Sequence, residues 1–170
     1  MARDHHIDLL GYFITFRCYG TWLHGDARGS VDDTHNIRGT EMLPADPRRE
    51  AAERARMAHS PQSLDQARRS LVEATIREAC EYRNWLLTAI NVRSNHVHVV
   101  VTADDIAPEE VMRVMKARAS RRLREGGLLA KHERLWSEHG STIYLWTEAQ
   151  VSAAIWYVTE GQDQPKPKDD

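Results

Sequence analysis

The sequence predicts an α+β domain with an antiparallel sheet, in the order strand, helix, strand, strand, helix, strand and a closing helix. Three observations predict it. The β-branched run at 96–102 alternates histidine with valine, which is typical of a strand with one face in a core. Residues 63–82 carry apolar side chains at helical spacing. Pro108 and Gly126 bracket a second long helix, because proline is favoured at a helix start and glycine just after its end.

The first strand is expected over residues 12–23, which are rich in aromatic and β-branched types, although Gly20 can bend or end it. Residues 24–61 form a long polar insertion punctuated by glycine and proline, with a short helix over 48–58. The helix over 63–82 follows, with Ser63 and Gln66 as an expected capping box.

A β-hairpin is expected next, with arms at 85–92 and 96–102 joined by the turn 93–95. After the second long helix, residues 134–146 predict a strand that is interrupted or bent at His139 and Gly140. Thr147 and Gln150 then match a capping box at the start of the last helix.

This order is that of a ferredoxin-like βαββαβ core with an additional C-terminal helix, which carries Tyr157. The 170 residues, 41% of them hydrophobic, suffice for one domain, expected over 1–162, with a disordered charged tail over 163–170. No apolar run is long enough to span a membrane, and the N-terminus does not resemble a signal peptide, so we expect a cytoplasmic protein.

The formal net charge of −2 does not by itself indicate a nucleic-acid ligand, but the charge distribution is uneven. The helix over 108–125 has an excess of three positive charges and could follow a phosphate backbone. A solvated helix surface would look the same.

His96 and His98 are expected on one face of their strand, with the intervening valines on the other. Two adjacent neutral imidazoles are suited to hold a metal ion. The alternative is a structural pair, in which each ring would need its own hydrogen-bond partner.

Tyr157 is expected beside the buried stripe of the last helix, about 240° around the axis from Val151. A tyrosine at this flank can overhang a cleft. The alternative is an ordinary amphipathic tyrosine, with its ring on the core and its hydroxyl in water.

The segment 94–99 (SNHVHV), the following helix with Lys116, and the late helix from Tyr157 to Gln162 occur here in a characteristic order. In this combination the chain resembles the single-tyrosine HUH transposases, among them the REP-associated tyrosine transposases and insertion-sequence-type relatives. The likeness spans about residues 12–162.

The resemblance implies a metal-dependent single-stranded DNA endonuclease and strand transferase that cleaves next to hairpins. Tyr157 would be the nucleophile, forming a 5′-phosphotyrosine. His96 and His98 would hold Mg²⁺ or Mn²⁺. In the family a polar residue four positions after the tyrosine completes the metal site, but here that position is Gly161. We expect Gln162 as the third ligand, with Glu160 as the alternative.

The expected partner is single-stranded DNA bearing a hairpin, bound by a monomer or by a homodimer with swapped tyrosine helices. The candidate contacts to the DNA backbone are Arg17, Lys116, Arg121 and Arg122. Two alternatives stay open: a replication-initiator or relaxase-like HUH nuclease, and a domesticated binding module for hairpin nucleic acids that has no catalytic activity.

Overall fold

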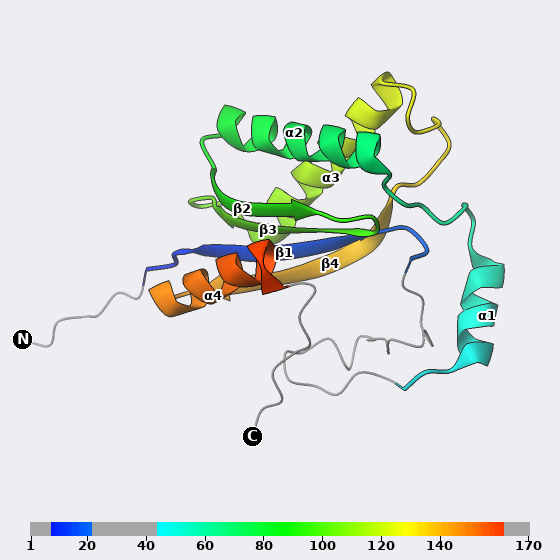
Figure 1. The fold of residues 1–170 in the computed structure, drawn as a ribbon, viewed down its shortest axis with the longest axis horizontal. Helices are drawn as coiled ribbons and strands as arrows, with labels where there is room; N and C mark the ends of the chain where they lie inside the picture. The colour runs from blue at the N-terminus through cyan, green and yellow to red at the C-terminus, as the bar shows by residue number, and fades with distance from the viewer. Residues whose placement is uncertain (1–7, 22–43, 162–170) are drawn as a thin grey trace, which may run out of the picture.

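A four-stranded antiparallel sheet forms the centre of the protein (Figure 1). The computed structural model describes residues 8–21 and 44–161. The strand order is β2-β3-β1-β4. The strands are β1 (Gly11–Cys18), β2 (Leu86–Val92), β3 (His96–Thr102) and β4 (Trp136–Leu145). The predicted α+β class and order of elements are therefore confirmed.

Helices cover both faces of the sheet. Figure 1 shows α2 and α3 on one face and α4 on the other. The described helices are α1 (Pro47–Arg56), α2 (Gln66–Tyr82), α3 (Pro108–Glu125) and α4 (Glu148–Thr159). None of them is long and apolar enough to cross a membrane.

The sheet separates a large apolar cluster from a small one. Val97, Val99 and Val101 are fully buried in the large cluster, together with side chains of α2 and α3. Val100, which lies between Val99 and Val101 on β3, belongs to the small cluster with Ala154 and Val158 of α4. Because strand side chains alternate between faces, His96 and His98 lie on the α4 side, as the predicted alternation requires.

Two helix starts show how local chemistry sets the element ends. The expected capping box of Ser63 and Gln66 is wrong: Asp65 is the N-cap of α2, and its carboxylate accepts from the Arg68 N–H. A carboxylate caps a helix as well as a hydroxyl does, and its negative charge also interacts favourably with the positive N-terminal end of the helix dipole. The capping box of Thr147 and Gln150 at α4 is confirmed.

Two strands are shorter than predicted. β1 ends at Cys18 because the chain turns at Gly20, whose φ of 73° favours glycine. β4 begins at Trp136, and its register against β1 shifts between the pairs Phe16–Gly140 and Cys18–Trp136. This irregularity lies at the predicted bend. The short helix expected over 48–58 is present as α1. Residues 22–43, which include the first part of the long insertion, and the 163–170 tail lie outside the described residues.

Candidate active site

His96 and His98 lie side by side on β3, with ring centroids 4.6 Å apart and ring planes at 72°. The pairing of β1 with β3 sets Thr15 opposite His98 and Arg17 opposite His96. Partners across a strand pair share a face of the sheet, so these side chains surround the imidazoles on the α4 side.

Each imidazole has a hydrogen-bond partner at Nδ1. The Nδ1 atom of His96 lies 2.6 Å from the Asn95 side-chain oxygen, and that of His98 lies 2.7 Å from the Thr15 hydroxyl oxygen. An amide oxygen only accepts, so Nδ1 of His96 carries the proton and its lone pair is on Nε2. When the Thr15 hydroxyl oxygen accepts a hydrogen bond from Nδ1 of His98, that ring has the same tautomer as His96. A metal-binding histidine is typically oriented by such a partner at its other nitrogen.

His98 is neutral over the physiological range. Its side chain is only 6% exposed, and burial lowers its pKa from the ordinary 6.5 to about 3, with further lowering by His96, Arg17 and Arg93. All of these neighbours are positive or become positive on protonation. The surroundings therefore favour a neutral ligand nitrogen and an anionic group beside it.

Tyr157 reaches the histidines from α4 of the same chain. Its ring centroid is 5.5 Å from that of His98 and 5.8 Å from that of Phe13, in edge-to-face geometry. Phe13 in turn stacks on His98 at 5.6 Å. The tyrosine remains 38% exposed, so its ring packs at the site while solvent still reaches it. This is the flank position that helical spacing predicts.

The third metal ligand stays a prediction. Gln162 lies outside the described residues. Glu160 is the exposed C-cap of α4. Over 8–21 and 44–161 no three His, Cys, Asp or Glu residues form a group that could hold a metal ion, so Glu160 does not join the two histidines in such a group. The structure brings together two oriented imidazoles, which supply part of the ligand set for Mn²⁺ or Mg²⁺. Nitrogen ligands suit Mn²⁺ better than Mg²⁺, which prefers oxygen.

The structure does not bring the basic helix to the histidines, because α3 packs on the opposite face of the sheet (Figure 1). The Lys116 ammonium donates to the carbonyl oxygens of residues 137, 138 and 139, at 2.9, 3.3 and 3.1 Å. Burial and the nearby Arg134 lower the pKa of Lys116 to about 8. This lysine is thus anchored at the irregular part of β4.

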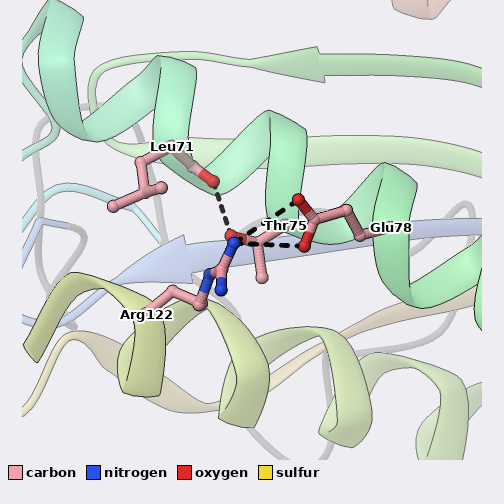
Figure 2. A network of polar contacts seen from close by, with 4 residues as sticks. All are labelled: Leu71, Thr75, Glu78 and Arg122. Carbon is pink, nitrogen blue, oxygen red and sulfur yellow. Dashed lines mark hydrogen bonds and ion pairs between the residues drawn. The ribbon is translucent and has the colours of Figure 1, made fainter. Parts of the chain in front are cut away.

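Two other predicted DNA contacts on α3 form ion pairs. Arg121 pairs with Glu125 at 2.8 Å, and Arg122 reaches across to Glu78 of α2 at 3.3 Å. Figure 2 shows this interhelical pair beside the hydrogen bond from Thr75 to the Leu71 carbonyl. Exposed pairs of this kind contribute little to stability and can exchange for a phosphate. Their contact with DNA stays a prediction.

Among the predicted basic residues, Arg17 is placed beside the imidazoles, opposite His96. Sequence reasoning missed Phe13, Thr15 and Asn95 as neighbours of the pair. Phe13, Thr15 and Arg17 alternate along β1 and therefore share a face, a signal that the sequence carries. Which of them meets which histidine depends on the register.

The fold and the site together define an α+β protein in which two oriented imidazoles on a strand lie beside the tyrosine ring of the last helix. Residues 57–153 match the family described as "Transposase IS200 like", and the chain belongs to this family. The matched segment includes both histidines and ends before Tyr157. Family membership implies nuclease activity and binding of DNA.

Two solved structures are similar in fold. One is a candidate transposase from Deinococcus radiodurans R1, with 12% identity, a TM-score of 0.49, and coverage of 93% of this chain and 95% of that chain. The other is a REP-associated tyrosine transposase bound to a REP hairpin, with 12% identity, a TM-score of 0.47, and coverage of 93% and 69%. No curated protein matches the chain.

Proposed function

We propose that this protein is a metal-dependent single-stranded DNA endonuclease and strand transferase that cleaves next to hairpins through Tyr157. The observation that carries the proposal is the position of the Tyr157 ring beside His98 of the same chain, with the two ring centroids 5.5 Å apart. Membership in the IS200-like transposase family supports transposition over the role of a replication initiator or relaxase. The sheet order β2-β3-β1-β4 supports assigning the core to the ferredoxin-like architecture.

In the proposed reaction the Tyr157 oxygen attacks the scissile phosphorus, and its proton is released to solvent. The bond from phosphorus to the 3′ oxygen breaks, and that oxygen takes up a proton. The products are a 5′-phosphotyrosine and a free 3′-hydroxyl. Attack of a 3′-hydroxyl on the phosphotyrosine later rejoins DNA and restores the phenol, so no external energy source is required.

His96 and His98 would hold the metal through Nε2, with Gln162 as the expected third ligand. Mg²⁺ or Mn²⁺ held there would supply polarisation of the phosphate oxygens and stabilisation of the charge that develops during attack. With Asn95 and Thr15 as acceptors at Nδ1, both imidazoles would present Nε2 to the metal. Arg17, next to His96 across the strands, favours a phosphate at the site.

The test uses labelled single-stranded DNA hairpins from the flanks of the gene, with Mn²⁺ or with EDTA, analysed on a denaturing gel. The wild type is compared with Tyr157→Phe and with the matched control Tyr144→Phe. Tyr144 is also partly exposed, but it packs on Tyr12 and Trp146, away from the histidines.

We expect a metal-dependent covalent protein–DNA band in the wild type and in Tyr144→Phe, and none in Tyr157→Phe. Hairpin binding without a covalent band, for every flank tried, would instead support a non-catalytic binding module. A band that persists in Tyr157→Phe would refute the assignment of the nucleophile.

A further inference from the structure

The helix that carries Tyr157 packs on the sheet through a small apolar cluster. Only Ala154 and Val158 of α4 are buried, in a cluster with Ala89, Val100 and Leu145. Both are small or medium-sized side chains, and Trp156 is more than half exposed. Few buried apolar contacts give a segment low local stability. Val151 and Ile155 of α4 pack against the edge of this cluster, so a polar contact at the last turn adds to a small apolar interface.

One such contact joins this turn to the sheet. The Asn91 side-chain amide of β2 donates to the Val158 carbonyl oxygen at 2.9 Å. Val158 follows Tyr157 directly and lies in the last turn of α4. The Asn91 amide thus links the end of the helix to a strand position 67 residues away in sequence.

The strand register relates this contact to the histidines. Asn91 is the direct partner of His98 in the β2–β3 pairing, so the two side chains are neighbours on the α4 face. Asn91 therefore holds the residue after Tyr157, while its neighbour His98 contacts the Tyr157 ring. Tyr157, the proposed nucleophile, is thus connected to His98, the proposed metal ligand, through the Asn91–Val158 hydrogen bond and the pairing of Asn91 with His98.

We propose that Asn91 is a positioning residue, which holds the last turn of α4 so that Tyr157 stays over His98 of its own chain. This inference rests on the proposed function for its catalytic consequence. Asn91 touches neither the scissile phosphate nor the metal in this arrangement. Its loss leaves the reacting groups intact and lowers the fraction of molecules in which the tyrosine is aligned with them.

The test compares Asn91→Leu, which keeps the side-chain size and removes the donor, with Thr102→Val as a matched control. Thr102 also makes one long-range hydrogen bond from a strand side chain to a backbone carbonyl, that of Leu10 at 2.7 Å. Two properties are measured: hydrogen exchange of the amides at 156–159 in the free protein, and covalent adduct formation at saturating hairpin DNA with Mn²⁺.

For Asn91→Leu we expect exchange roughly 3- to 10-fold faster and adduct formation slower by a similar factor, as the loss of one hydrogen bond predicts. DNA affinity and adduct formation by Thr102→Val should stay at the wild-type level. Unchanged exchange in Asn91→Leu, equal changes in both variants, or a loss confined to DNA affinity would each overturn the inference. If the wild type forms no adduct, the proposed function fails, and the exchange measurement still decides whether Asn91 holds the helix.

Discussion

Protonation of His98 should destabilise the fold in mildly acidic solution. Burial, with the nearby His96, Arg17 and Arg93, lowers the His98 pKa to about 3 in the folded protein, against 6.5 when unfolded. The unfolded chain therefore binds this proton more readily, so stability is complete above pH 6.5 and is lost as the pH falls toward 3. Each pH unit in this window costs about 1.4 kcal/mol, which gives about 2 kcal/mol at pH 5.0.

The assay is urea unfolding at pH 7.5 and pH 5.0, in EDTA, for the wild type and for His98→Gln. Other groups titrate in both proteins, so the difference between their two pH responses isolates the histidine. We expect the free energy of unfolding of the wild type to fall by about 2 kcal/mol more than that of the variant. An equal fall in both proteins would refute the argument that His98 is buried in its neutral form.

Three substitutions test other contacts. Thr15→Val removes the hydroxyl at Nδ1 of His98 and should weaken Mn²⁺ binding by about 10- to 100-fold in calorimetric titration; unchanged affinity would contradict its orienting role. Lys116→Met removes the donors to three carbonyls of β4 and should cost about 2–3 kcal/mol in denaturant unfolding, whereas a loss of DNA affinity alone would show that its role is binding. Gly140→Ala would set a Cβ atom 2.5 Å from the Thr15 carbonyl oxygen, so it should destabilise the protein by about 1–3 kcal/mol; a wild-type melting temperature would show that β4 can move away.

Patterns that depend on neighbours in the sequence were predicted well. The alternation in β3 sets both histidines on one face, and the helical spacing of α4 sets Tyr157 at the flank of the buried stripe. The Thr147–Gln150 capping box formed as expected. The Ser63–Gln66 box did not form, because two residues on Asp65 offered a competing cap that the sequence pattern did not exclude.

Contacts between distant segments could not be derived in the same way. The sequence contains Thr15, Arg17 and Asn91, but only the register of β1 and β2 against β3 shows that they adjoin His96 and His98. A shift of one residue in either pairing would send those side chains to the other face. The basic residues of α3 follow the histidines closely in sequence, but α3 packs on the other face of the sheet. Nearness in sequence therefore did not bring them to the site.

The sequence by itself thus determined the elements, their order and the side chains that carry the candidate chemistry, because backbone periodicity and capping are local. The tertiary structure decided which of these side chains meet. It placed α4 on the histidine face of its own sheet and α3 on the other, and it brought Asn91 to the end of the tyrosine helix. These placements follow from strand register and from the burial of apolar faces, which involve the whole chain at once.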